Sequence, residues 1–419
     1  MEVKSIIYLV AAFLAAGVIA FVTTPLVKSF AHKIGAIDVP KDNRRMHKKP
    51  IPRLGGLAIF LGFFCSVLVF CDIDTEMRGI LIGAVIIVVL GVIDDVMALS
   101  AKLKFVVQIG AALVPVLCGV RIDIFSNFNF FSDQPFINLG VLSIPVTVIW
   151  IVAITNAVNL IDGLDGLACG VSSIACFSLL IIAVAVGEPV TATVIAALAG
   201  SCIGFLPYNL NPAKIFMGDT GATFLGFILA TISVQGLFKF YTVVSFAVPF
   251  LILGLPIFDT VLAIVRRIAS GKSPMQADRG HFHHKLIDMG FSQKQTVAIL
   301  YALSAILGMT AVVLTTTGTA KAAVLVLAAL IVGLFAARAL GKTARAQSDE
   351  KKRRESILAD EEIYQEIYGD DPSFSPVVPV EKRATVHIPG EERGAAVPKL
   401  KATAKRKHDS RSASKKKER

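Results

Sequence analysis

The sequence predicts an all-α polytopic membrane protein with about eleven transmembrane helices, polar cytoplasmic loops and a disordered, basic C-terminal tail. Three observations support this fold class. Of the 419 residues, 54% are hydrophobic and only 17% are charged, whereas soluble domains carry roughly 25% charged residues. The mean hydropathy is +0.69. Long apolar runs alternate with short polar joints up to about Arg338, and the chain becomes charged beyond Gly341.

A bilayer span needs about 20 mostly apolar residues. The segments that meet this requirement are 4–27, 54–71, 78–97, 103–119, 141–157, 167–186, 189–206, 219–236, 242–265, 296–316 and 319–338. The joint 120–140 is longer than most and rich in phenylalanine, which predicts a short hairpin lying at the membrane interface.

Lysine and arginine residues predict the orientation, because they accumulate in cytoplasmic loops. A basic stretch from Lys28 to Arg53 follows the first segment, so the N-terminus is expected outside. The inside joints are then 28–53, 98–102, 158–166, 207–218, 266–295 and the tail. The joint 266–295 is also basic, whereas the outside joint 72–77 carries three acids.

The composition divides the chain into a transmembrane domain, 1–340, and a charged tail, 341–419. The tail carries KKRR at 351–354 and ends in KKKER. It lacks apolar periodicity, which predicts a disordered cytoplasmic segment. Its basic clusters would contact anionic lipid headgroups; a purely solubilising tail is the alternative.

Acidic residues at the inner ends of the segments are the first candidates for function, because carboxylates at such depths are rare and usually functional. Asp94 and Asp95 end the segment 78–97, where two adjacent acids oppose the helix dipole. Mg²⁺ would stabilise them, since it takes one or two carboxylates together with phosphate oxygens. A solvated acidic pair is the alternative. Lys102, just past this segment, is expected to neutralise phosphate charge.

The joint after the fifth segment reads NAVNLIDGLDGLACG. Its amides and acids recur every three residues, at Asn156, Asn159, Asp162 and Asp165, and the two acids would share a helical face. Such density at membrane depth predicts contacts with a ligand, and an ordinary polar turn is the alternative.

Asp219 opens the eighth segment in the string MGDTG. It could be an N-cap, which is a purely structural role. The same helix N-terminus would also bind an anion or a metal–phosphate complex. The other acidic clusters on the same side favour the functional interpretation.

The joint 266–295 combines Arg279 with three histidines, His281, His283 and His284. A zinc site is one interpretation, and a solvated loop is another. The surrounding arginines and lysines disfavour a cation and instead indicate a pyrophosphate-binding loop.

Five strings in order, each at an inside joint, resemble the polyprenyl-phosphate N-acetylhexosamine-1-phosphate transferase family, glycosyltransferase family 4. They are RRMHKKPIPRLGG, IDD, NAVNLIDGLDGLA, GDTG and ADRGHFHHKL. The resemblance covers about residues 5–338. The muramoyl-pentapeptide branch shows a run of three histidines where this chain has His281-Phe282-His283-His284, so the resemblance is greatest to the GlcNAc-1-phosphate branch.

The resemblance implies transfer of N-acetylhexosamine-1-phosphate, above all GlcNAc-1-phosphate, from the UDP-sugar to undecaprenyl phosphate. UMP would be released, and the product would initiate a lipid-linked cell-envelope glycan. The implied cofactor is Mg²⁺, with Mn²⁺ as an alternative. The implied setting is the bacterial inner membrane, with no nucleic-acid partner and with scope for a homodimer. The alternatives are the phospho-muramoyl-pentapeptide transferase of the same family, a CDP-alcohol phosphotransferase and, from another class, a secondary transporter.

The site predicted on this basis has three parts. The catalytic residues are Asp94, Asp95, Asp162 and Asp219. The metal ligands are Asp219, Asp94 and Asp95. The substrate-binding residues are Lys102, Asn156, Asn159, Asp165, Arg279, His281, His283 and His284.

Overall fold

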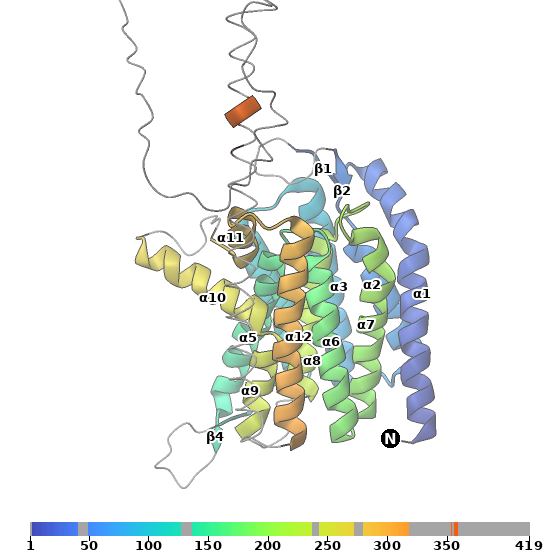
Figure 1. The fold of residues 1–419 in the computed structure, drawn as a ribbon. Coiled ribbons are helices and arrows are strands. Elements are labelled where there is room, and N and C mark those ends of the chain that lie inside the picture. Colours follow the sequence, from blue (N-terminus) through green and yellow to red (C-terminus); the bar gives the residue numbers. More distant parts are fainter. Residues whose placement is uncertain are drawn as a thin grey trace, which may run out of the picture. The chain divides into compact units, whose positions relative to one another are not determined.

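Helices make up almost all of the described structure, which is a computed structural model (Figure 1). It describes residues 2–40, 49–126, 136–236, 243–271 and 280–317, together with 353 and 356–358. The chain divides into two units, 1–352 and 353–419. The first unit contains every helix and strand considered below.

The helices of this unit follow the apolar segments of the sequence. Their bounds are α1 Val3–Ile34, α2 Gly56–Phe70, α3 Thr75–Met97, α4 Ala101–Leu117, α5 Ser143–Ile161, α6 Leu167–Val186, α7 Pro189–Asn209, α8 Gly218–Gly236, α9 Val243–Ile252, α10 Gly254–Ala269, α11 Phe282–Asp288 and α12 Gln293–Thr317. The strands are β1 Ile37–Asp38, β2 Ile51–Pro52, β3 Ile124–Ser126 and β4 Phe136–Asn138. A one-turn 3₁₀ helix, Gly140–Leu142, precedes α5.

The predicted segments from 4–27 to 219–236 coincide with α1 to α8, and 296–316 coincides with α12. The prediction of a continuous helix over 242–265 is wrong, because this stretch forms α9 and α10 with a break at Leu253. Pro256 lies just after the break and has no N–H with which to continue the helical ladder. The segment 319–338 lies outside the described residues.

Six helices of the described residues are long and apolar enough to cross a membrane: α1, α3, the 3₁₀–α5 stretch Gly140–Ile161, α6, α7 and α12, the last over Gln293–Thr316. Among the other helices, α2 has 15 residues and α4 has 17. The chain is therefore a multi-pass membrane protein.

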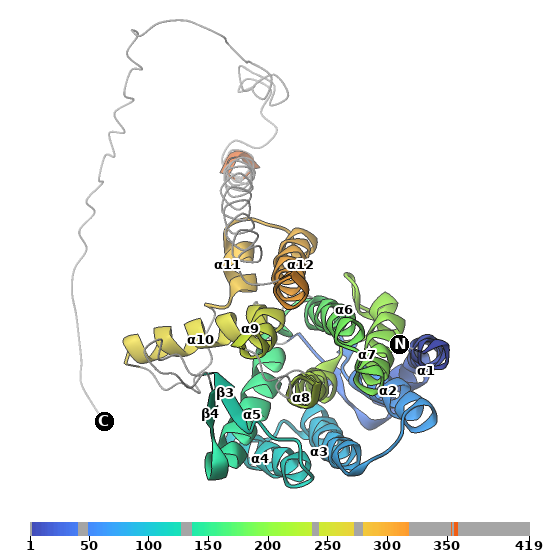
Figure 2. The ribbon, with the colours of Figure 1, turned by 90° about the horizontal axis from the view of Figure 1, so that it is seen from below.

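Helix α8 lies at the centre of the bundle, between α3 and α5 and in contact with α2, α6 and α7 (Figure 2). Its residues from Thr220 to Val234 are all buried. On the periphery, α1 packs along α7 and α2. Gly200 and Gly204 of α7 allow this close approach, because a Cβ on either would lie 2.1 Å from a carbonyl oxygen of α1. Small residues four apart commonly bring membrane helices together in this way.

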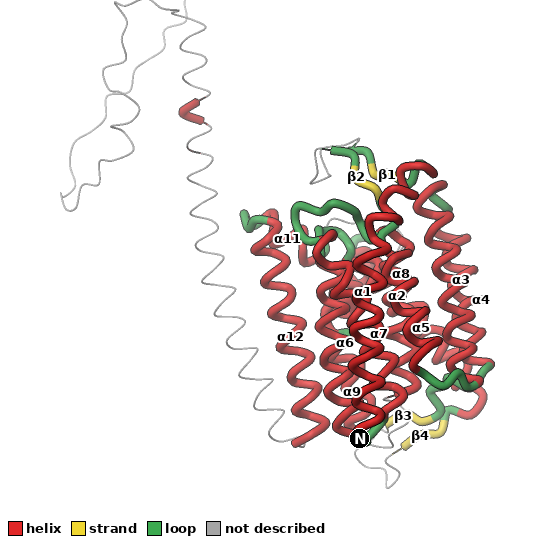
Figure 3. Tube along the Cα trace, turned by 90° about the vertical axis from the view of Figure 1, so that its right-hand side faces the viewer, coloured by secondary structure: helices red, strands yellow, loops and turns green. Residues whose placement is uncertain are grey.

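The two antiparallel strand pairs lie at opposite ends of the bundle (Figure 3). The pair β3–β4 lies at the end where the chain begins, and it confirms the hairpin predicted for 120–140. The pair β1–β2 lies at the other end, together with α11 (Figure 1). The joints predicted to be cytoplasmic therefore gather at one end of the helices.

Candidate active site

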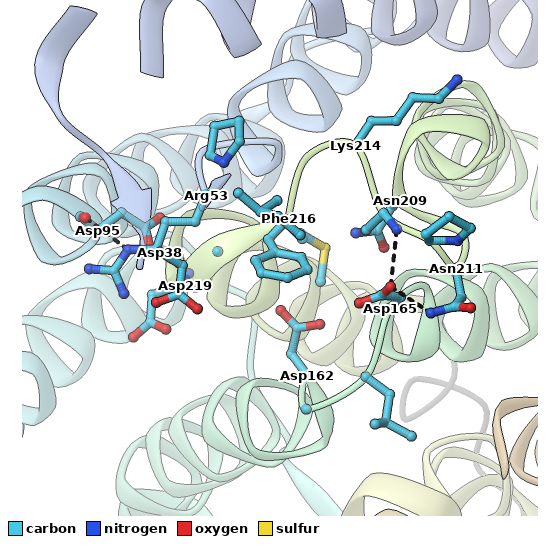
Figure 4. Close-up of a pocket in the computed structure, with 18 of the residues that line it drawn as sticks. Asp38, Arg53, Asp95, Asp162, Asp165, Asn209, Asn211, Lys214, Phe216 and Asp219 are labelled. Carbon is cyan, nitrogen blue, oxygen red and sulfur yellow. Dashed lines mark hydrogen bonds and ion pairs between the residues drawn. The ribbon is translucent and has the colours of Figure 1, made fainter. Parts of the chain in front are cut away.

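A pocket of about 1010 Å³ occupies this second end of the bundle. Its walls come from the joints predicted to lie inside (Figure 4). Its charged and histidine side chains are Lys28, His32, Asp38, Lys49, Arg53, Asp95, Lys104, Asp162, Asp165, Lys214, Asp219 and His284. Carboxylates and cations thus share one cavity, as a site for a metal-bound polyanion requires.

One wall is built where β2 meets the joint before α8. The Phe216 N–H donates to the Pro52 carbonyl oxygen at 2.8 Å. The N–H groups of Gly55 and Gly56 donate to the carbonyl oxygens of Phe216 and Met217 at 2.9 and 2.8 Å. The described part of the RRMHKKPIPRLGG string therefore adjoins the GDTG string, and the Phe216 side chain contributes an aromatic surface to the pocket.

Lys104 joins two of the predicted catalytic acids. Its Nζ lies 2.9 Å from Oδ2 of Asp94 and 2.9 Å from Oδ2 of Asp219. Asp94 also accepts a hydrogen bond from the Leu99 N–H at 2.7 Å. Asp94 is buried and does not line the pocket, whereas Asp219 does. The structure thus places one cation between the end of α3 and the beginning of α8.

The lysine singled out from the sequence was Lys102, but the structure brings Lys104 to the pocket instead. Lys102 is exposed and does not line the cavity. Both lysines belong to the first turn of α4, which begins at Ala101. Residues two apart lie on different faces of a helix, so the register of α4 decides between them.

Asp95 caps the N-terminus of α8. Its Oδ1 accepts the Asp219 N–H at 3.1 Å, and its Oδ2 accepts the Thr220 N–H at 3.0 Å and the Thr220 hydroxyl at 2.6 Å. The Arg53 Nε lies 4.0 Å from Oδ1. An α3 side chain therefore supplies the cap that the alternative interpretation of the sequence gave to Asp219, and the Asp219 carboxylate is left facing Lys104 and the pocket.

Asp162 follows the last residue of α5, and its carboxylate points into the pocket (Figure 4). None of the described residues donates a hydrogen bond to this carboxylate. Removal from water, with the nearby charges of Asp219, Asp95 and Asp165, raises the pKa of Asp162 to about 8. A cation in the pocket would favour its ionised form. Asn159 of α5 also lines the pocket.

Two further residues of this joint make structural contacts. The Asp165 Oδ2 accepts hydrogen bonds from the Asn211 amide at 2.9 Å and the Ala213 N–H at 3.0 Å, at the edge of the pocket. Asn156 does not line the pocket; its amide donates to the Gln108 Oε1 at 2.7 Å, between α5 and α4. The predicted substrate contact at Asn156 is thus replaced by a bond between helices.

The three histidines are not equivalent. His284 lines the pocket. His281 and His283 are buried, and the His281 Nδ1 lies 2.8 Å from Oδ2 of Asp259. Burial and the two neighbouring histidines lower the pKa of His283 to about 4, against the opposing effect of Asp259. Arg279 lies outside the described residues.

In the part of the chain that the structure describes, no three His, Cys, Asp or Glu side chains form a metal-binding group. Asp94 contacts Lys104 and Asp95 caps α8, so neither is placed as the metal prediction expected. Mg²⁺ does not require three such ligands, because it commonly keeps several waters and binds one or two carboxylates plus substrate phosphate. Asp219 and Asp162, which share the pocket, fit that requirement.

Several pocket residues were missed from the sequence. Asn209, Asn211, Lys214 and Phe216 lie in the joint before α8 and line the cavity. The available signal was a joint rich in polar residues on the predicted inner side. Asp259 was also missed, although an acid inside an apolar segment is itself a signal.

Residues 77–237 match the family model described as glycosyl transferase family 4. The chain is 44% identical over 313 residues to a probable undecaprenyl-phosphate N-acetylglucosaminyl 1-phosphate transferase of Bacillus subtilis, with 74% of this chain and 86% of the relative covered. The chain belongs to glycosyl transferase family 4.

Other similar proteins differ in their named substrates. A decaprenyl-phosphate N-acetylglucosaminephosphotransferase of Mycolicibacterium smegmatis is 35% identical, with 69% of this chain and 77% of the relative covered. A phospho-N-acetylmuramoyl-pentapeptide-transferase of Staphylococcus aureus is 31% identical, with 71% and 96% covered. The matched family 4 region runs from α3 to α8 and so includes the acids at both ends of the Lys104 bridge.

Proposed function

We propose that this family 4 protein is a polyprenyl-phosphate GlcNAc-1-phosphate transferase, acting on UDP-GlcNAc and undecaprenyl phosphate and releasing UMP. The observation that carries the proposal is the 44% identity to the Bacillus subtilis protein, over 86% of that relative's length. The pocket supports it, because carboxylates and cations meet at one end of a membrane bundle. The product would initiate a lipid-linked glycan of the cell envelope.

The reaction exchanges one phosphoanhydride for another. An oxygen of the polyprenyl phosphate attacks the phosphorus that carries the sugar, and the bond from that phosphorus to the bridging oxygen breaks. UMP leaves with the bridging oxygen. The second pKa of a phosphomonoester is near 6, so the attacking group is largely a dianion at pH 7 and needs no strong base. Catalysis therefore depends on positioning and on neutralising charge.

The residues of the pocket divide these tasks. Lys104 lies where it would neutralise phosphate charge once a substrate competes for its contacts with Asp94 and Asp219. Asp219 and Asp162 would hold Mg²⁺, the expected cofactor in this family, which would supply further charge neutralisation on the phosphates. Asn159 and His284 would contact the donor, and Asp165 would support the joint beside it.

The finer topology belongs to the same proposal. The N-terminus is outside, and the pocket, the joint 266–295 and the tail 341–419 are cytoplasmic. Eleven crossings result if α9 and α10 together make the ninth and 319–338 makes the last. The lysine and arginine distribution supports this orientation, as does the position of the pocket at the end of the bundle away from the chain start. The cell membrane of a bacterium is the expected location.

The rival functions have less support. A muramoyl-pentapeptide donor is the named substrate of relatives at 31% identity, which is lower than the 44% identity to the Bacillus subtilis protein. A secondary transporter would place its polar site near the middle of the membrane, whereas the charged residues that line the pocket here come from the joints and helix ends at one end of the bundle.

The test measures UMP release by the purified full chain in detergent. UDP-GlcNAc, UDP-GalNAc and the UDP-muramoyl-pentapeptide are offered in parallel, with and without undecaprenyl phosphate and Mg²⁺. We expect UMP release from UDP-GlcNAc only when both additions are present. Preference for the pentapeptide donor, or no UMP from any donor under all conditions, would contradict the proposal.

A further inference from the structure

We propose that Asp259 of α10 is a positioning residue for the reaction site, which holds the beginning of α11 so that His284 faces the pocket and His283 closes against the turn carrying Asp162. This inference rests on the proposed function, because it assigns a task in that reaction to a residue outside the pocket. Asp259 is 4% exposed and does not line the cavity. It can therefore act only through other residues.

Both carboxylate oxygens of Asp259 are directed to the start of α11. Oδ2 lies 2.8 Å from the His281 Nδ1, and Oδ1 accepts the Phe282 N–H at 2.8 Å. His281 is the residue before the first turn of α11, and its own side chain makes no cap hydrogen bond. Asp259 thus caps α11 from another helix and orients the neighbouring imidazole.

This arrangement selects one form of His281. An ionised carboxylate only accepts hydrogen bonds, so with Asp259 ionised this contact requires a proton on the His281 Nδ1. A buried carboxylate is costly unless it is paired and hydrogen-bonded. Burying the Asp259 carboxylate in the apolar helix α10 therefore costs free energy that an apolar residue at position 259 would not cost. The contacts with His281 and Phe282 offset this cost.

A row of histidine rings continues from the Asp259–His281 pair to the pocket. The rings of His281 and His283 are nearly parallel, at 8°, with centroids 5.8 Å apart. The His283 and His284 ring centroids are 4.2 Å apart. His283 also lies against Gly163, where a Cβ would be only 2.3 Å from its Nε2. Gly163 directly follows Asp162, so displacement of α11 would disturb both His284 and the Asp162 turn.

The experiment compares Asp259→Asn, His281→Leu and His281→Asn in the full-length protein. Asp259→Asn keeps an acceptor oxygen but places an amide N–H against His281. His281→Leu removes the hydrogen bond. His281→Asn retains it, because the amide nitrogen can replace Nδ1 as donor. Asp123→Asn is the matched control, since Asp123 accepts the Ser143 hydroxyl at 2.8 Å near the other end of the bundle.

With UDP-GlcNAc as the varied substrate, we expect Asp259→Asn and His281→Leu each to lower kcat/KM about ten- to a hundredfold. The double variant Asp259→Asn/His281→Leu should have a kcat/KM no lower than that of either single variant. His281→Asn should recover most of the kcat/KM that His281→Leu loses, and Asp123→Asn should stay within about threefold of wild type. His281→Asn and Asp123→Asn should keep the thermal midpoint of wild type. Asp259→Asn and His281→Leu disturb a buried pair, so each is assayed well below its own thermal midpoint. An Asp259→Asn variant as active as the control, or His281→Asn as poor as His281→Leu, would overturn the proposal.

Hydrogen exchange separates this inference from the proposed function. The Phe282 amide should exchange at least about tenfold faster in Asp259→Asn than in wild type, because it loses its charged acceptor. This measurement needs no enzyme activity. If the wild-type protein were inactive, the proposed function alone would be contradicted. If exchange at Phe282 were unchanged, the positioning role would be contradicted.

Discussion

Asp94, Asp95 and Asp219 lie close together at one end of the bundle but have different surroundings, from which we infer different tasks. Asp94 is held by Lys104 and the Leu99 N–H. Asp95 accepts three hydrogen bonds from the first residues of α8. Asp219 shares Lys104 but also lines the pocket. Substitutions at Asp95 and Asp219 should therefore have distinguishable effects.

Asp219→Asn should lower kcat by more than about a hundredfold, because it removes a charge that would face the transferred phosphate and Mg²⁺ in the proposed reaction. Its thermal midpoint should stay close to that of wild type, since Asp95 rather than Asp219 caps α8. Turnover in detergent and thermal unfolding are the two measurements.

Asp95→Asn is the informative comparison. It weakens a buried cap and should cost on the order of 1–3 kcal/mol of stability, visible as a lower thermal midpoint. If Asp219→Asn were instead the less stable variant and retained full turnover, the assignment of tasks to these two residues would be reversed.

His283 predicts a pH dependence of stability. Its pKa is lowered from 6.5 to about 4 in the folded protein, so the unfolded chain binds more protons between these values. The neutral form stabilises the fold above pH 6.5, and this contribution, on the order of 3 kcal/mol, is lost as the pH falls toward 4. His283→Gln should unfold with a flatter pH dependence across this window, measured by thermal unfolding in detergent. Identical pH profiles for wild type and variant would contradict a buried neutral histidine.

At the scale of elements, the contact between α11 and the Asp162 turn makes a prediction for Gly163. A Cβ at this position would meet the His283 Nε2 at 2.3 Å, so Gly163→Ala should lower stability by on the order of 1–3 kcal/mol through overpacking. His283→Ala makes room, and the double variant should be more stable than Gly163→Ala alone.

Gly110→Ala in α4 is the control for this pair, because a Cβ there meets nothing within 4 Å. Alanine in a helix is favoured over glycine by about 1 kcal/mol, so this variant should be at least as stable as wild type. Strict additivity of Gly163→Ala and His283→Ala would show that α11 and the Asp162 turn do not pack as described.

At the scale of the whole molecule, the orientation of the bundle can be tested with impermeant thiol reagents in intact cells. Met289→Cys, in an exposed position just after α11, should be protected because the proposed orientation places it in the cytoplasm. Asp72→Cys, exposed in the joint between α2 and α3, should be labelled readily. Both are made in a background without the six native cysteines. The opposite pattern would place the pocket outside and remove access to a cytoplasmic nucleotide sugar.

Much of this molecule could be predicted from the sequence, because the bilayer imposes a simple rule. Each crossing needs a long apolar run, and the runs matching α1 to α8 are found with boundaries close to those of the helices, except that α1 continues to Ile34, well beyond the predicted end at 27. The hairpin at 120–140 and the gathering of Asp95, Asp162 and Asp219 at one end also follow from the alternation of joints. Family membership was indicated by five short strings at those joints.

Only the tertiary structure decided what each polar side chain contacts. The choice of Lys104 over Lys102 depends on the register of α4, and the capping of α8 by Asp95 joins residues more than a hundred positions apart. The bond between Asp259 and His281 likewise depends on how α10 meets α11. Hydropathy and charge report each segment's preference for lipid or water, whereas hydrogen bonds need atoms within about 3 Å, and only packing of the helices brings those atoms together.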